Sequence, residues 1–117
     1  MNTLSIPLLA AAIALVALVP AQAQEAVKKC LACHTFDKGG AKKIGPNLFG
    51  VYGQPTTLPE LAGKAIVWDD ANLMAYLENP SAFLAAKTGG TAKSKMALLV
   101  KDAAERKAAI DHLKTLK

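Results

Sequence analysis

The chain begins with an unbroken apolar run, residues 8–19, and none of its first 23 residues is charged. A run of that length is too short to cross a bilayer comfortably as a helix. Pro20 follows the run, and Ala21-Gln22-Ala23 then places small residues at alternate positions, as at a signal-peptidase site. The pattern predicts a cleaved signal peptide over residues 1–23 and a mature domain over residues 24–117. Retention of the segment as an uncleaved membrane anchor is the alternative.

Beyond the predicted signal peptide, apolar positions recur at helical spacing in short segments separated by turn residues. The expected helices cover residues 25–34, a segment that Asp69 or Asp70 caps and that ends before Asn79, residues 80–86, and a segment that a capping box at 102–105 opens. Their apolar stripes comprise Leu73, Met74 and Leu77 in the second helix and Ala109, Ile110, Leu113 and Leu116 in the last. Apolar and polar positions nowhere alternate over five residues, which argues against strands. The sequence therefore predicts an all-α fold with long ordered loops.

The stretch from Phe36 to Val67 shows no regular pattern, and glycine and proline recur along it. Long loops inside a compact domain are usually functional. Aromatic residues make up only 5% of the chain, so side chains alone would give a thin core. We therefore expect a large apolar cofactor at the centre to organise this stretch.

Composition and charge narrow the class of protein. A length of 117 residues favours one domain. Lysine and arginine number 14 against 9 acidic residues, a net charge of +5, and all of the basic residues follow Ala23. This excess favours acidic partners. The apolar share of 52% and its distribution exclude a disordered chain and a multi-span membrane protein, and no nucleic-acid-reading motif occurs.

The segment Cys30-Leu31-Ala32-Cys33-His34 contains both cysteines and one of the two histidines. On a helix, positions i, i+3 and i+4 share a face, so Cys30, Cys33 and His34 are expected to point the same way. This spacing is typical of c-type haem attachment, in which two thioether bonds hold the porphyrin and the imidazole lies under the iron. The sequence predicts one haem c, bound covalently through Cys30 and Cys33.

Three other interpretations of the cysteine pair fit the sequence less well. A disulfide would close a loop too small to stabilise the chain much. A thioredoxin-like redox pair would need a βαβ surround, which the pattern does not predict. A zinc site would need four ligands, and the only cysteine or histidine outside the motif is the distant His112. The adjacent Cys33 and His34 would also fit one tetrahedral ion poorly.

The sixth ligand of the iron would decide the function, and three residues after the motif could supply it. Met74 shares helical spacing with Leu73 and Leu77, which favours a core position, and His112 in the last helix is expected to pack or to be exposed. Met96 lies in a loop where no helix face requires an apolar residue. A thioether ligand such as Met96 raises the reduction potential. Two ligands from the protein would leave no site for a substrate, which argues against catalysis.

Further segments follow one another in an order shared with a known family. They are Lys38-Gly39-Gly40, Gly45-Pro46-Asn47-Leu48-Phe49-Gly50-Val51-Tyr52-Gly53, Trp68, Asn72-Leu73-Met74-Ala75-Tyr76-Leu77-Glu78-Asn79-Pro80, Lys95-Met96 and Glu105-Arg106. With the cysteine motif, they make the chain resemble the class I cytochromes c, close to the mitochondrial and bacterial c2-like branch. The resemblance implies helices wrapped around one covalent haem, with electron transfer at its exposed edge.

The resemblance also implies the axial ligands of the iron. It makes His34 the proximal ligand and Met96 the distal ligand. The carbonyl of Pro46 would accept a hydrogen bond from the other ring nitrogen of His34 and fix its orientation. A turn that merely stiffens the loop is the plainer explanation of Pro46.

Three more residues acquire roles near the haem from the same resemblance. Tyr76 would lie near the sulfur of Met96, and Ser94 stands where the family usually has threonine. Trp68 would donate a hydrogen bond to a haem propionate. Plain core packing would also explain Trp68 and Tyr76.

The chain departs from the family pattern at several points. Ala26 stands where the family has an aromatic residue, and His112 replaces the aromatic residue expected opposite it, so the contact between the terminal helices should be weaker or built differently. The segment 53–68 is short and lacks a tyrosine that usually reaches a propionate. The segment 80–96 is long, so the loop that carries Met96 is expected to be mobile.

Together these features predict a soluble, monomeric one-electron carrier of the periplasm. Its partners would be redox proteins with acidic docking surfaces, such as an oxidase, a cytochrome bc1-type complex, a reaction centre or a dehydrogenase. Lysines flank the segments expected around the haem edge, namely Lys28, Lys29, Lys42, Lys43, Lys87, Lys93 and Lys95. Two alternatives remain: a haem enzyme or gas-binding cytochrome with a labile sixth ligand, and a tethered haem subunit of a dehydrogenase or oxidase. Nucleic acid is not expected as a partner, nor is membrane insertion once the signal is cleaved.

Overall fold

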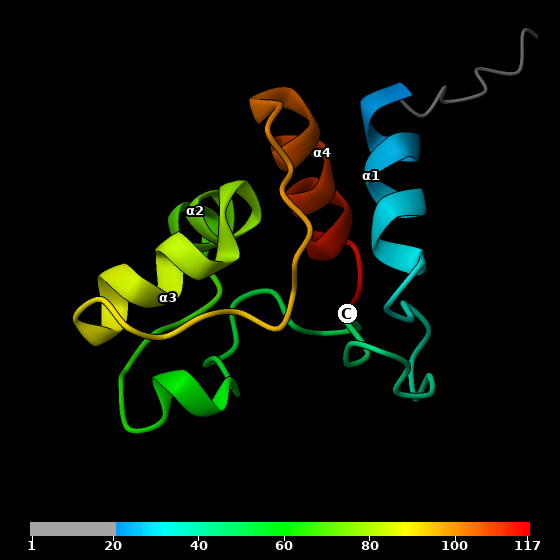
Figure 1. Ribbon diagram of the computed structural model, residues 1–117. Coiled ribbons are helices and arrows are strands. Elements are labelled where there is room, and N and C mark those ends of the chain that lie inside the picture. Colours follow the sequence, from blue (N-terminus) through cyan, green and yellow to red (C-terminus); the bar gives the residue numbers. More distant parts are fainter. Residues whose placement is uncertain (1–20) are drawn as a thin grey trace, which may run out of the picture.

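A computed structural model of the protein describes residues 21–117, and most of the predicted signal peptide lies outside the described residues. The elements are α1 (Ala21–Leu31), the 3₁₀ turn η1 (Pro59–Leu61), α2 (Asp70–Glu78), α3 (Pro80–Thr88) and α4 (Ala103–Lys114) (Figure 1). Within residues 21–117 no strand forms, and one isolated bridge joins Pro55 to Val67. The predicted all-α class is confirmed. None of the helices in this part of the chain has both the length and the hydropathy needed to cross a membrane.

The predicted starts of the later helices are confirmed by side-chain caps. The carboxylate of Asp69 accepts a hydrogen bond from the backbone N–H of Asn72 at the start of α2. Asn79 caps α3 in the same way, and Pro80 provides its first residue. Asp102 caps α4 by accepting from the N–H groups of Ala104 and Glu105. Helix α3 runs two residues beyond the predicted end at 86.

The predicted capping box at the start of α4 is only half formed. Asp102 caps the helix, but the carboxylate of Glu105 turns to α1, where it lies 2.6 Å from Nζ of Lys29. This hydrogen bond raises the pKa of Lys29, and the Glu105 side chain is only 13% exposed. A tertiary ion pair between the two terminal helices has therefore replaced the local bond that the sequence pattern predicted.

The prediction of a helix over residues 25–34 was wrong at both ends, because α1 begins at Ala21 and ends at Leu31. Two carbonyl groups near its C-terminus find partners in the following loop. Nζ of Lys43 donates to the carbonyl of Leu31 at 2.6 Å, and the N–H of Gly45 donates to that of Cys33 at 2.8 Å. These bonds satisfy carbonyls that a longer helix would have used, and they bring the loop against the cysteine motif.

The helices pack around a small core in an order that differs from the chain order: α1 lies against α4, α4 against α2, and α2 against α3 (Figure 1). Ala26 of α1 is 2% exposed, so the small side chain is buried between the terminal helices. An aromatic ring is supplied there from outside the helices, since Phe36 meets His112 edge to face with ring centroids 5.0 Å apart. The contact expected to be weaker or different is thus built differently.

The loop from residue 36 to residue 67 is organised by hydrogen bonds within itself and to neighbouring segments. The side-chain amide of Asn47 donates to the carbonyls of Asp37 and Gly40, at 2.7 and 3.0 Å. The N–H of Gly50 donates to the carbonyl of Leu116, next to the C-terminus, at 2.9 Å. The stretch also contains η1, so the expectation of a wholly irregular segment was wrong in part.

Candidate functional site

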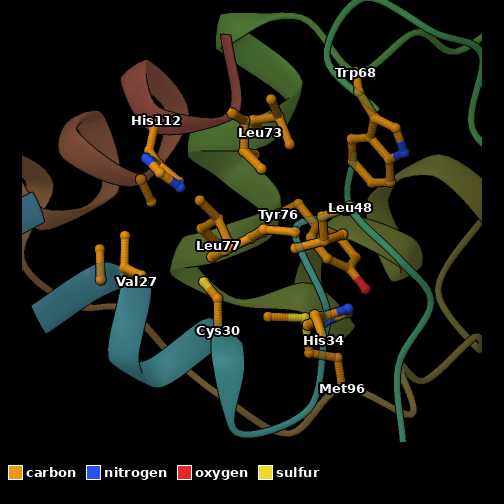
Figure 2. A pocket seen from close by; sticks show the side chains of 14 residues that line it. Val27, Cys30, His34, Leu48, Trp68, Leu73, Tyr76, Leu77, Met96 and His112 are labelled. Carbon is orange, nitrogen blue, oxygen red and sulfur yellow. The ribbon is translucent and has the colours of Figure 1, made fainter. Parts of the chain in front are cut away.

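An apolar cavity lies where α1, α2, α4 and two loops meet (Figure 2). The three helices contribute mainly small and aliphatic residues with Cys30, Tyr76 and His112, and the loops add His34, Met96 and further apolar residues. The lining consists of Ala26, Val27 and Cys30 from α1, Leu73, Tyr76 and Leu77 from α2, Ala109, His112 and Leu113 from α4, and His34, Phe36, Leu48, Trp68 and Met96 from the connecting segments. The structure therefore brings an imidazole, a thiol and a thioether from distant parts of the chain into one apolar site.

His34 is held by the loop that follows the cysteine motif. Its Nδ1 lies 2.6 Å from the carbonyl oxygen of Pro46. A carbonyl oxygen can only accept, so Nδ1 must carry the proton that is donated. In the neutral ring, Nε2 then carries the lone pair and is the nitrogen available to a metal. The backbone thus selects the tautomer that a ligand needs.

Gly45 is a residue of the site that the sequence analysis used only as a family landmark. A Cβ built on Gly45 would lie 2.7 Å from Nδ1 of His34 and overlap Cε1. Real Cβ contacts are essentially never that short, so no larger residue fits while the ring keeps its place. The glycine before Pro46 lets the backbone approach the imidazole, and the Gly-Pro pair was the available signal.

The two cysteines are free and half-buried, but they are placed differently. Cys30 lines the cavity, whereas Cys33 is not among the lining residues. Cys30 and His34 thus face the same cavity; α1 ends at Leu31, and a turn continues in which the N–H groups of Cys33 and His34 both donate to the carbonyl of Cys30. Burial raises the pKa of the Cys30 thiol, with nearby Glu105 adding to the effect.

Met96, which also lines the cavity, is positioned by Ser94. The N–H of Met96 donates to Oγ of Ser94 at 3.0 Å, and the same Oγ lies 3.3 Å from the hydroxyl of Tyr76. Burial raises the pKa of Tyr76, so its hydroxyl stays protonated at neutral pH. The three residues assigned to the distal side by resemblance therefore lie together.

Trp68 is buried at the edge of the same group. It is 7% exposed, meets Tyr76 edge to face at 4.9 Å and stacks on Phe83 at 5.9 Å. These contacts make it part of the core, as the plainer explanation held. Its hydrogen bond to a propionate stays a prediction.

The two other potential ligands take different positions. Met74 packs against the core outside the cavity lining, as expected from its helical spacing. His112 does line the cavity, and Figure 2 shows it at the end away from His34. Its ring contacts Phe36, so the expected packing role accounts for its position.

The donor set fits haem c better than a bare metal ion. The cavity walls are almost entirely hydrocarbon, which suits a porphyrin face. Imidazole nitrogen and thioether sulfur are the usual haem ligands that protein side chains provide in electron carriers. Cys30 would supply one thioether from the cavity wall, and Cys33 the other from the adjoining turn.

Comparison with known proteins gives a consistent result. The family described as Cytochrome c matches residues 20–117. Cytochrome c2 of Rhodospirillum rubrum is 45% identical over 108 residues, which cover 83% of this chain and 96% of that protein. Cytochrome c-550 of Novispirillum itersonii is 38% identical over 108 residues, with 83% of this chain and 97% of that protein covered.

Solved structures are similar over the same part of the chain. The structure of cytochrome c2 from Rhodobacter sphaeroides superposes with a TM-score of 0.72 at 28% identity and covers 83% of this chain and 94% of its own. That of cytochrome c2 from Rhodospirillum centenum gives 0.69 at 28% identity, covering 84% and 98%.

Proposed function

The chain belongs to the cytochrome c family, and we propose that it is a periplasmic one-electron carrier whose haem iron is ligated by His34 and Met96. It is a class I, c2-like c-type cytochrome and an electron-transfer protein rather than an enzyme. The family carries covalent haem c, and Cys30 and Cys33 fit that attachment.

One observation carries the ligand assignment: His34 and Met96 line the same apolar cavity, and both are held from behind by hydrogen bonds. The carbonyl of Pro46 fixes the ring of His34 and leaves the lone pair of Nε2 available to the iron. The hydroxyl of Ser94 fixes the backbone of Met96. When bound, haem supplies an iron that changes by one electron. The apolar residues around it would limit the access of water, and two ligands from the protein would leave no open position on the iron for a substrate, which suits a carrier.

The periplasmic location is supported by the sequence before the domain. The apolar run over residues 8–19, Pro20 and the small residues at 21–23 have the order of a secretory signal. In the structure, residues 21–23 lie in the first turn of α1. Cleavage after Ala23 would therefore shorten that helix by three residues and leave Ala26 and its packing in place.

The lysines support docking to acidic redox partners, but they are not equivalent. All seven lysines near the expected haem edge are exposed. Lys29 is paired with Glu105, and Lys43 bonds to the Leu31 carbonyl. Within residues 21–117, Lys93 and Lys95 have no ion-pair partner, and they flank Ser94 beside Met96. Their charge, like that of the equally unpaired Lys42 in this part of the chain, is therefore available for steering.

A Met96→Ala variant tests the ligand assignment, and Met74→Ala provides the matched control because Met74 packs outside the cavity. We expect Met96→Ala to lose the absorption band of the thioether–ferric bond. Its midpoint potential should fall by on the order of 0.1 V, within the range of about 0.8 V over which axial ligands tune haem. Met74→Ala should keep both properties. An unchanged spectrum and potential in Met96→Ala would show that another residue ligates the iron.

A further inference from the structure

Ser81 lies in the first turn of α3, thirteen positions before Ser94 in the chain, and contacts the loop that carries Met96. Its Oγ accepts a hydrogen bond from the backbone N–H of Ser94 at 3.0 Å. The start of α3 is itself firmly placed, because Asn79 caps the helix and Pro80 is among the most deeply buried residues of the protein. The hydroxyl of Ser81 is thus a fixed point against which the loop is held.

From Ser81 the hydrogen bonds continue directly to Met96. Ser94, whose N–H is held by Ser81, uses its own Oγ to accept from the N–H of Met96 at 3.0 Å. The hydroxyl of Tyr76 lies 3.3 Å from the same Oγ and ties it to α2. Two serine hydroxyls therefore connect the backbone of Met96 to the rigid start of α3.

The rest of this loop makes few hydrogen bonds, and its other contacts are the apolar ones that Ala92, Met96 and Leu98 make with the core. It leaves α3 through Gly89 and Gly90, whose φ values of 83° and 114° belong to a turn. It next joins the fold where the N–H of Val100 donates to the carbonyl of Leu77 at 2.8 Å. In the described part of the chain, the backbone bonds made by residues 91–99 go to the hydroxyls of Ser81 and Ser94. Loss of either hydrogen bond should therefore loosen the position of Met96.

We propose that Ser81 is a positioning residue for Met96, and that its hydroxyl keeps the thioether at the iron by holding the long loop against α3. This inference rests on the proposed function, in which Met96 is the distal ligand. Part of the long segment 80–96 folds into α3, and the loop that follows returns to the first turn of that helix.

The test measures how readily added imidazole replaces Met96 in the ferric holoprotein. Ser81→Ala removes the acceptor for the Ser94 N–H, so the loop opens more easily. Imidazole should then bind about two- to tenfold more tightly, the factor that corresponds to one ordinary hydrogen bond. Ser81→Thr keeps the hydroxyl and should bind imidazole as the parent does. Equal affinity in Ser81→Ala and the parent would overturn the proposal.

A second control separates loss of the bond from general loosening of α3. The hydroxyl of Thr88 donates to the carbonyl of Leu84 at the other end of the helix and does not reach Ser94. Thr88→Ala should leave imidazole affinity unchanged, and an increase equal to that of Ser81→Ala would count against a specific role. Should Ser81→Ala yield no holoprotein, amide exchange in the parent decides. A Ser94 amide that exchanges as fast as those of Lys93 and Lys95 would refute the bond.

Failure of this inference is distinguishable from failure of the proposed function. If Met96→Ala keeps the thioether–ferric band, Met96 is not the ligand, and the proposed function fails together with this inference. If Met96→Ala loses the band while Ser81→Ala binds imidazole like the parent, the ligand assignment stands and only the role of Ser81 is rejected.

Discussion

The two sides of the haem site are held by different kinds of bond. On the His34 side, backbone groups hold the ring in place. The carbonyl of Pro46 accepts a hydrogen bond from Nδ1, the N–H of Gly45 donates to the carbonyl of Cys33, and the missing side chain of Gly45 leaves room for the ring. On the Met96 side, the bonds to the loop backbone come from the hydroxyls of two serines. A backbone contact survives most substitutions, whereas a side-chain contact is lost with a single one. The histidine side is therefore built to stay fixed, and the methionine side can be tuned residue by residue.

The largest expected effect comes from breaking the histidine side at Gly45. Gly45→Ala places a methyl group on the imidazole of His34, so either the ring or the loop must move. Overpacking of this kind costs about 1–3 kcal/mol. Holoprotein yield and thermal unfolding should both fall, and the potential should shift because the bond to Pro46 is strained.

Gly63→Ala is the control for Gly45→Ala. A Cβ there meets nothing within 4 Å, although φ is +78°, so only the left-handed backbone costs about 1 kcal/mol. We expect destabilisation of Gly63→Ala without a shift in potential. Equal potentials in the parent and Gly45→Ala would mean that the ring tolerates displacement and that this side is less fixed than we describe.

A smaller effect should separate the charges on the two sides. Reversal of Lys95 should slow electron transfer to an acidic partner several-fold at low salt, because its charge has no ion-pair partner among residues 21–117. Reversal of Lys29 should slow it less, since Glu105 already offsets that charge. The difference should shrink as the screening length falls below about 10 Å. Stopped-flow rates over a salt series would measure it, and equal rates for both variants would contradict the ranking.

The smallest expected effect is on the pH of acid unfolding, and it comes from the contact between Tyr52 and Asp70. The hydroxyl of Tyr52 donates to Asp70, and Lys114 also contacts this carboxylate; both contacts lower the pKa of Asp70 from its ordinary 3.8. A group with a lowered folded-state pKa stabilises the fold above its unfolded pKa, and that contribution is lost as pH falls through the folded value. Tyr52→Phe should therefore unfold at a slightly higher pH in an acid titration. An unchanged acid midpoint would show that Lys114 alone suffices.

The helix starts and the ligand segments could be predicted because their signals are local. A cap such as Asp102, or the spacing of Cys30 and His34, depends on residues within one turn. The end of α1 could not be predicted, since it depends on Lys43 reaching back to the carbonyl of Leu31. Likewise, nothing near Glu105 indicates that its carboxylate turns to Lys29 instead of completing the cap. Contacts between distant segments overrode local patterns at these points.

The site itself divides in the same way. Met96 could be preferred over Met74 from helical spacing alone, and Pro46 and Tyr76 followed from resemblance to a family. The role of Gly45 lies in its closeness to an imidazole eleven positions earlier, and the role of Ser81 lies in a bond to Ser94. Neither role leaves a periodic pattern in the sequence, because each depends on a loop that folds back against a distant residue.

The hydrogen bond from Gly50 to Leu116 has a consequence for the order in which the molecule is completed. Leu116 lies 66 positions after Gly50, so a chain made from its N-terminus offers Gly50 no partner until that later segment has been made. The interface between α1 and α4 also forms late, because α4 follows the other helices in the chain. The cysteine motif at the end of α1 therefore stays uncovered until α4 has been made and has packed against that helix.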